Sequence, residues 1–282
     1  MPITRRQFLI HSAGAFTAAG AAAGLYTWRA EPHWLEIVTR PLPLRFLPAD
    51  LEGRTLALLT DLHVGAQVDD DYVIDVFTRV TALKPDYVAF VGDFASYETP
   101  ATADQLARVL EHLPHGRVAS IATLGNHDYG PGWEDANVAE KIATVCRNAG
   151  LQVLHNEIAR FDQLQIVGMD ELWAHRFAPA MALADFDASS PSIALSHNPD
   201  TVDRGGWGSF GSWILSGHTH GGQCKPPFLP PPLLPVRNRR YTSGEFSLAG
   251  GRRLYISRGV GHLMRVRFNV RPEVTMFRLI AA

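Results

Sequence analysis

From Arg54 onward, short runs of aliphatic and β-branched residues alternate with segments of helical periodicity, and each run stops at a polar cluster. Thr55 to Thr60 (TLALLT) has the composition of a buried strand, and Asp69 to Lys84 places its apolar side chains on one helical face before Pro85 ends it. This alternation predicts an α/β fold. Further strands are expected at Tyr87–Val91, Val118–Leu124, Leu151–Leu154, Leu164–Val167, Ile193–Leu195, Trp213–Leu215, Leu254–Ser257 and Val274–Leu279, and further helices at Gln105–Leu113 and Val138–Ala149.

The polar clusters follow the carboxyl ends of the predicted strands, which is where open α/β sheets bind ligands. Along the chain they are Asp61-Leu62-His63, Gly92-Asp93, Gly125-Asn126-His127-Asp128, Ser196-His197-Asn198 and Gly217-His218-Thr219-His220-Gly221-Gly222. Each cluster alone would usually be a helix cap, a turn or a satisfied polar pair. Five of them at strand ends together indicate a metal site.

Aspartate and histidine are suitable ligands for a pair of divalent ions. Carboxylate balances the charge, imidazole adds affinity, and a shared oxygen can hold two ions close together. In Asp61-x-His63 and His218-x-His220, a spacing of two sends both side chains to one side if the backbone is extended. Both members of each pair could then face one centre.

Composition narrows the kind of metal site. The chain has 12 histidines but only two cysteines, Cys146 and Cys224, so neither a disulfide framework nor a thiolate zinc site is expected. The formal net charge of -2 lacks the basic footprint of a nucleic-acid-binding domain, and no nucleic-acid partner is expected.

The first 30 residues form a separate segment. Arg5-Arg6-Gln7-Phe8-Leu9, followed by an Ala/Gly-rich apolar stretch to about Leu25, resembles a twin-arginine export signal. The stretch is expected to be too short to span a bilayer securely, and its small residues would permit cleavage near Ala23. We therefore expect residues 1–30 to be a twin-arginine signal or N-terminal anchor. The alternative is an ordinary amphipathic helix of a cytoplasmic protein.

Residues 31–282 are expected to form a single domain, because no internal repeat and no long linker divides them. With the twin-arginine route, this domain would lie in the periplasm or on the outer face of the cytoplasmic membrane.

The motifs D-x-H, G-D, G-N-H-D, a lone histidine and G-H-T-H, in this order, resemble the calcineurin-like metallophosphoesterase superfamily over residues 55 to about 280. The stretches Gly217–Gln223, Asn238–Tyr241 and Ser257–Gly261 are most similar to its bacterial phosphodiesterase branch of the YaeI/YkuE type. That branch also resembles UDP-2,3-diacylglucosamine hydrolases. The resemblance implies a four-layer α-β-β-α sandwich.

The resemblance also implies two divalent metal ions and a role for each motif residue. One ion would be held by Asp61, His63, Asp93 and His220, and the other by Asp93, Asn126, His197 and His218. A metal-bridging hydroxide would attack phosphorus, His127 would protonate the leaving oxygen, and Asp128 would orient His127. Histidine-rich ligation suits manganese, zinc or iron.

Residues outside the motifs are weighed against plainer roles. His262 follows a segment resembling the family's active-site rim, although a hydrogen-bonded structural histidine is the commoner case. Asp170 and Glu171 could reach substrate, but solvated carboxylates at the start of a loop are commoner. Lys225–Val236 (KPPFLPPPLLPV) is either a rigid loop packed into the body or an exposed apolar lip for an amphiphilic phosphate substrate or a membrane surface.

The expected function is hydrolysis of a phosphodiester or pyrophosphate outside the cytoplasm, with a lipid-linked or nucleotide-sugar phosphate as one substrate class. The alternatives are a phosphomonoesterase or protein phosphatase, and a non-catalytic envelope-binding protein on the same fold. Retention of His127, which is not needed as a ligand, disfavours the non-catalytic alternative. The sequence does not determine the natural substrate, the metal pair or the oligomeric state.

Overall fold

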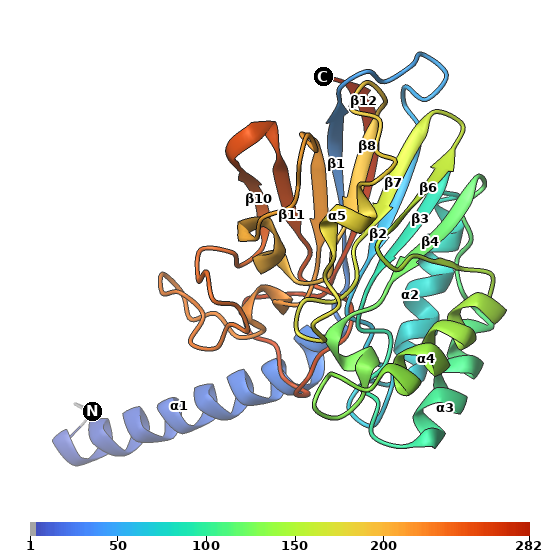
Figure 1. The fold of residues 1–282 in the computed structure, drawn as a ribbon. Coiled ribbons are helices and arrows are strands. Elements are labelled where there is room, and N and C mark those ends of the chain that lie inside the picture. The colour runs from blue at the N-terminus through green and yellow to red at the C-terminus, as the bar shows by residue number, and fades with distance from the viewer. Residues whose placement is uncertain (1–3) are drawn as a thin grey trace.

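The structure, a computed structural model, describes residues 4–282, so the first three residues of the predicted export signal lie outside it. Two six-stranded sheets pack face to face, with helices outside them (Figure 1). The long helix α1 (Arg5–Leu25) projects away from this body. The α/β class and the two-sheet sandwich expected from the sequence are confirmed.

The first sheet has the strand order β1-β12-β2-β3-β4-β5. Its neighbours pair in parallel except β12 and β2, which are antiparallel. The strands are β1 (Glu36–Leu44), β2 (Thr55–Leu59), β3 (Tyr87–Val91), β4 (Ala119–Thr123), β5 (Gln152–Val153) and β12 (Glu273–Ala281).

The second sheet has the order β10-β11-β9-β8-β7-β6, with antiparallel pairs only at its two edges. The strands are β6 (Glu157–Phe161), β7 (Leu164–Gly168), β8 (Ser192–Leu195), β9 (Trp213–Ser216), β10 (Gly244–Ser247) and β11 (Arg253–Ile256). The buried core between the sheets takes alternate residues of each strand. Leu56 and Leu58 of β2 and Ile193 and Leu195 of β8 contribute to it, as the period of two requires.

Three helices cover the outer face of the first sheet: α2 (Asp70–Ala82), α3 (Pro100–Leu110) and α4 (Ala136–Asn148). Asp135 is the N-cap of α4, because its side chain accepts hydrogen bonds from the Asn137 and Val138 amides. The outer face of the second sheet is covered more thinly, by α5 (Pro179–Ala182), the 3-10 helix Pro199–Asp203 and loops. Further 3-10 turns are Asn126–Tyr129, His220–Gly222 and Ala249–Gly251.

The predicted elements are present within a few residues, except that α3 begins five residues earlier than expected and ends at Leu110. Pro100 suits the first turn of that helix, where no amide hydrogen bond is lost. The edge strands β1, β6 and β10 were not predicted. Prolines in β1 and charged residues in β6 mask the strand pattern, and edge strands tolerate both.

The N-terminal helix differs from the expectation of a short apolar run. Helix α1 continues through a π-helical turn (Tyr26–Ala30) and a 3-10 turn (Glu31–His33), and the run Arg5–His33 is long and apolar enough to cross a membrane. The 21 residues of α1 alone extend about 30 Å, close to the thickness of a bilayer core. The prediction that the segment is too short to span a bilayer is therefore wrong.

Hydrogen bonds join the base of α1 to the body. The backbone amide of Arg267 donates to the Thr27 carbonyl over 3.0 Å, and the Val270 amide donates to the buried carboxylate of Glu31 over 2.6 Å. Arg267 is itself fully buried, and its guanidinium donates to the carbonyl of Gly261, whose amide donates to the Asp61 carbonyl. The segment after α1 is thus connected to the loop that carries Asp61.

Candidate metal centre

The five predicted clusters meet where the carboxyl ends of the two sheets converge. The first three follow β2, β3 and β4 of one sheet, and the last two follow β8 and β9 of the other. Adjacent loops are hydrogen-bonded along their backbones, with the Asp61 amide donating to the Gly92 carbonyl and the His63 amide to the Asp93 carbonyl, each over 3.0 Å. One centre therefore receives side chains from both sheets.

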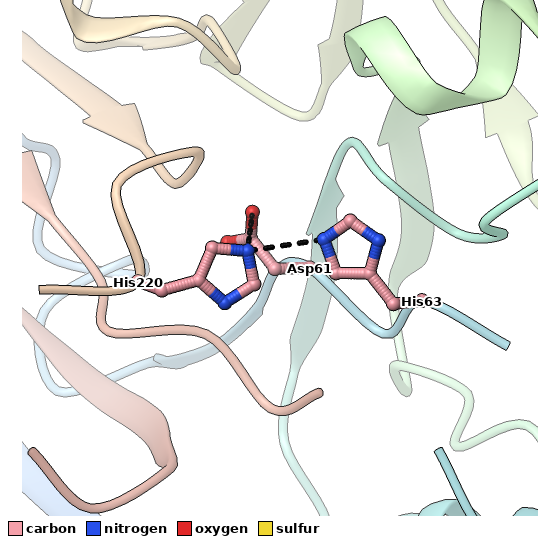
Figure 2. Close-up of side chains that lie close together, drawn as sticks. All are labelled: Asp61, His63 and His220. Carbon is pink, nitrogen blue, oxygen red and sulfur yellow. Dashed lines mark hydrogen bonds and ion pairs between the residues drawn. The ribbon is translucent and has the colours of Figure 1, made fainter. Parts of the chain in front are cut away.

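Asp61, His63 and His220 form one group of side chains suited to a metal ion. Their ligand atoms all lie within 4.8 Å of one another. Nε2 of His220 lies 3.0 Å from Nε2 of His63 and 3.5 Å from an Asp61 carboxylate oxygen. Figure 2 shows the two imidazoles converging with the aspartate, although they are 157 residues apart in the sequence.

Asp93, His197 and His218 form a second group with the same property. Nε2 of His197 lies 3.1 Å from Asp93 Oδ2 and 3.3 Å from Nδ1 of His218. The same Asp93 oxygen lies 3.4 Å from Nε2 of His63, which belongs to the first group. Asp93 therefore stands between the two groups, where one carboxylate can serve two ions.

The backbone at these positions is not extended. Asp61, His63, Asp93, His218 and His220 all have positive φ, between 49° and 71°. The extended backbone considered for the two spaced pairs is therefore wrong for both. Asp61 and His63 still join one group, whereas His218 and His220 join different groups, as the family resemblance implied. Left-handed backbone costs on the order of 1 kcal/mol at each non-glycine residue, so the surrounding fold must hold these loops.

Burial controls the protonation of the histidines. It lowers the pKa of His63 and of His218 to about 3, and that of His220 well below its usual range. These three imidazoles are therefore neutral near pH 7, as metal binding requires. His197 differs because the adjacent Asp93 carboxylate overcomes the effect of burial and raises its pKa.

The second ring nitrogen of three histidines is hydrogen-bonded away from the centre. Nδ1 of His63 lies 3.0 Å from the Ser96 hydroxyl, and Nδ1 of His197 donates to the Val91 carbonyl over 2.9 Å. Nε2 of His218 donates to the Pro235 carbonyl over 2.8 Å. Such bonds fix the ring orientation and the tautomer, which leaves the other nitrogen free to bind a metal.

Asn126 supports the presence of an ion. It is fully buried, yet neither its amide oxygen nor its amide nitrogen has a partner among the described residues, and one oxygen of Asp61 is also unpaired. Buried polar atoms of this kind are costly unless something binds them. Together with the nitrogen and oxygen donors of both groups, they fit a pair of divalent metal ions.

The backbones around the aspartates approach closely. A Cβ atom on Gly125 would lie 2.3 Å from a carboxylate oxygen of Asp93, and one on Gly217 would lie 2.4 Å from Asp61 Oδ2. Only glycine fits at these two places.

His127 lies beside the centre but belongs to neither group. Its ring packs edge-on against His63 with centroids 5.0 Å apart, and its backbone amide donates to Asp93 over 2.9 Å. Asp128, which was expected to orient His127, instead accepts hydrogen bonds from the Gly125 and Ala95 amides. Burial raises the pKa of Asp128 to about 8.

Two tryptophans near the centre were not predicted. Trp173 packs edge-on against His218 at 4.5 Å between ring centroids, and Trp133 lies 5.8 Å from His127 and 4.8 Å from Trp173. They line a pocket of about 610 Å³ with a mixed polar and apolar wall, which also includes Arg204. No sequence signal marks them, because they occur in irregular loops.

Asp170 and Glu171 are buried, so the expectation of solvated carboxylates is wrong. Asp170 accepts a hydrogen bond from the Tyr129 hydroxyl and lies 3.3 Å from His155. Burial raises the pKa of Glu171 to about 7. Glu171 accepts a hydrogen bond from the Trp173 amide over 3.0 Å.

The other residues weighed from the sequence lie outside the metal groups. His262 is fully buried and its Nε2 donates to the Gln67 carbonyl, which is a structural role. Cys146 and Cys224 are unpaired, as expected. In Lys225–Val236, the relative exposure of Phe228 is 105%, that of Leu233 67% and that of Leu229 60%, so these side chains are not packed into the body.

Comparison with known proteins agrees with this geometry. Residues 54–222 match the family model described as calcineurin-like phosphoesterase. The chain is 32% identical to phosphodiesterase YaeI of Escherichia coli over 99% of its own length and all of the relative. It is 30% identical to the uncharacterized metallophosphoesterase YkuE of Bacillus subtilis, with 98% of each chain covered. It is also 29% identical to UDP-2,3-diacylglucosamine pyrophosphatase LpxG of Chlamydia trachomatis, over 92% of this chain and 94% of the relative. The resemblance expected from the motifs is confirmed, and the chain belongs to the calcineurin-like phosphoesterase family.

Proposed function

We propose that this protein is a two-metal hydrolase that cleaves a phosphodiester or pyrophosphate bond outside the cytoplasm. The observation that carries the proposal is the position of Asp93 Oδ2, within 3.4 Å of an imidazole nitrogen from each group. One ion is assigned to Asp61, His63, Asp93 and His220, and the other to Asp93, Asn126, His197 and His218. Manganese, zinc and iron all suit these donors.

When bound, a metal pair in such a site lowers the pKa of a coordinated water and stabilises negative charge on the phosphoryl oxygens. The residues of the chain determine where this happens. Asp93 holds the two halves of the centre together, while the hydrogen bonds from His63, His197 and His218 to Ser96, Val91 and Pro235 keep the ligand rings in place.

His127 is assigned the proton transfer to the leaving group. Its ring lies next to His63 at the partly open side of the centre, and it is not needed as a ligand. A ring nitrogen there can give a proton to the departing oxygen as the phosphorus–oxygen bond breaks. A purely metal-binding, non-catalytic protein would have no use for this residue.

An amphiphilic phosphate ester is the substrate class we favour. A pocket lined by Arg204 and Arg237 lies beside Trp133 and Trp173, and exposed apolar side chains lie on the Pro-rich segment. The relative LpxG is named as a UDP-2,3-diacylglucosamine pyrophosphatase, and the relative YaeI is named as a phosphodiesterase. Both names suit cleavage between phosphates or of a diester rather than of a terminal phosphate.

Export by the twin-arginine route is part of the proposal, with the enzyme in the periplasm or on the outer face of the cytoplasmic membrane. Arg5 and Arg6 begin α1, which has no buried residue. Phe228 and Leu229 would contact the membrane surface next to it.

The test is hydrolysis by metal-stripped protein resupplied with manganese, zinc, iron or magnesium. We expect activity on bis-p-nitrophenyl phosphate to return with metal and to exceed activity on p-nitrophenyl phosphate. Faster cleavage of the monoester would favour a phosphomonoesterase. Two bound ions per chain with no hydrolysis of either compound would favour an envelope-binding protein.

A further inference from the structure

An apolar pocket of about 320 Å³ adjoins the metal centre on the side of the Pro-rich segment. No residue that lines it carries a full charge near neutral pH. The lining residues are Thr219, His220, Gly222, Gln223, Cys224, Pro232, Leu233, Leu234, Pro235, Leu263 and Met264. His220 also belongs to the first metal group, so the pocket and the centre share a wall.

The pocket lies close to the base of α1. Residues Arg267 and Phe268 connect the two, because the Arg267 amide donates to the Thr27 carbonyl and the Phe268 amide donates to the Gln223 carbonyl. The Lys225 amide in turn donates to the Phe268 carbonyl over 2.9 Å. The apolar helix, which is long enough to enter a membrane, therefore begins close to the pocket wall. Only the short segment containing Arg267 and Phe268 separates them.

The rim of the pocket is apolar as well. Leu233 and Met264 are more than half exposed, and Leu263 is 38% exposed. Exposed apolar groups around an apolar pocket are unfavourable in water and favourable against hydrocarbon. A bound chain of methylene groups would cover these surfaces, and a volume near 300 Å³ lies within the range of natural ligand pockets.

We propose that this pocket binds an acyl chain of the substrate while the phosphate of the same molecule lies at the metal centre. The assignment of the phosphate rests on the proposed function, but binding of the chain does not. A chain that enters from the membrane beside α1 passes between Leu233 and Met264 and ends against His220. The substrate class is therefore a phosphate ester of an acylated lipid.

Cys224 provides a reporter inside the pocket. It is partly exposed and lines the pocket, whereas Cys146, the other cysteine in the sequence, is fully buried. Burial raises the pKa of the Cys224 thiol, so its alkylation by N-ethylmaleimide is followed at mildly alkaline pH. The full chain is placed in phosphatidylcholine nanodiscs, and the alkylation rate is measured with dodecyl phosphate or with ethyl phosphate at equal concentration.

Dodecyl phosphate is expected to slow alkylation about tenfold and ethyl phosphate less than about twofold, because only the chain fills the pocket. The expectation holds in metal-stripped and in manganese-loaded protein, so a protein that binds the chain but hydrolyses nothing would refute only the proposed function. Leu233→Asp should abolish protection, since a carboxylate in the wall opposes hydrocarbon. Leu83→Ser, which alters an exposed leucine at the end of α2 and outside the pocket, should retain it.

Photo-crosslinking tests the same point without Cys224. A phosphatidic acid with a diazirine near the end of one acyl chain is added to the nanodiscs, and the modified peptides are mapped by mass spectrometry. Crosslinks at 219–224, 232–235 or 263–264 support the proposal, including the case in which Cys224 reacts too slowly to follow. Equal effects of the two phosphates on alkylation, or crosslinks confined to α1 and Phe228, would overturn it.

Discussion

Nε2 of His218 donates a hydrogen bond to the backbone carbonyl of Pro235, so a metal-site histidine is held by the Pro-rich segment 17 residues further along the chain. This bond orients the ring so that Nδ1 faces His197. The Pro-rich segment is therefore part of the support of the centre as well as part of its rim.

Replacing Pro235 with glycine should weaken metal binding. The carbonyl would remain, but the backbone that presents it would gain conformational freedom. Loss of such outer hydrogen bonds usually costs about tenfold or more in affinity. Titration of the metal-stripped protein with manganese or zinc measures the effect, and Pro230→Gly, at an exposed position of the same segment, is the matched control.

Asp93→Asn should remove the metal ion from one of the two sites and should abolish activity. The amide cannot carry the charge that a bridging carboxylate supplies to two ions, and we expect a loss of about 10³-fold or more in kcat/KM. Metal content per chain and hydrolysis of bis-p-nitrophenyl phosphate are measured on the same preparation. The exposed Asp104→Asn variant controls for charge, and full activity in Asp93→Asn would refute the shared-ligand assignment.

His127→Ala should retain metal but lose activity in a substrate-dependent way. A p-nitrophenolate leaving group needs little protonation, whereas an alkoxide leaving group needs it strongly. We therefore expect a loss of about 10² to 10⁴-fold on an alkyl diester and a smaller loss on the p-nitrophenyl diester. Equal losses on the two compounds would assign His127 to positioning. His112→Ala, which alters an exposed histidine, serves as control.

Phe228→Ser combined with Leu229→Ser should reduce hydrolysis of a long-chain phosphodiester presented in vesicles. These exposed side chains contribute burial only when the protein lies on the bilayer. Hydrolysis of soluble bis-p-nitrophenyl phosphate should be unchanged. Leu83→Ser, which alters an exposed leucine at the end of α2, is the control. If the double substitution affected hydrolysis of the vesicle and the soluble substrate equally, the proposed membrane contact would be refuted.

Acid should destabilise the protein partly through His262. Burial lowers its pKa to about 4. Its surroundings contain His33 at 6.4 Å between ring centroids, the charged groups of Arg265 and Arg267, and the Gln67 carbonyl to which it donates. No neighbouring carboxylate hydrogen-bonds to His262 in residues 4–282.

The unfolded chain binds the His262 proton below pH 6.5 and the folded chain only near pH 4, so stability falls as pH decreases through this window. His262→Gln should reduce that fall by up to about 3 kcal/mol. Denaturant unfolding of manganese-loaded protein at pH 7 and pH 4.5 measures it, with His112→Gln as control. A variant with the same pH dependence as the parent would contradict the role of His262.

The alternation of strands and helices predicted the α/β class, and local signals at strand ends predicted the five clusters. The two-sheet sandwich was predicted only through family resemblance. The separate roles of His218 and His220 were likewise predicted only through family resemblance. The backbone at these residues could not be predicted, because positive φ at histidine is enforced by contacts with loops far along the chain. The contacts of Ser96, Trp173 and Pro235 with the metal-site histidines could not be predicted for the same reason, since none of the three lies in a metal-binding motif.

The edge strands and the packing of Asp128 show a second limit. Prolines in β1 and charges in β6 are acceptable only because those strands lie at sheet edges, and edge position depends on the whole topology. An aspartate next to a histidine in the sequence suggests that the two side chains form a hydrogen bond. In the structure, the Asp128 carboxylate instead accepts hydrogen bonds from the backbone amides of Gly125 and Ala95.

The connection from Thr27 through Arg267 and Gly261 to Asp61 has a kinetic consequence. If α1 serves as a membrane anchor, this chain of hydrogen bonds holds the metal centre at a constant height above the lipid headgroups. Encounter with a lipid substrate then becomes a search in two dimensions, and turnover should depend on the mole fraction of substrate in that leaflet rather than on its bulk concentration.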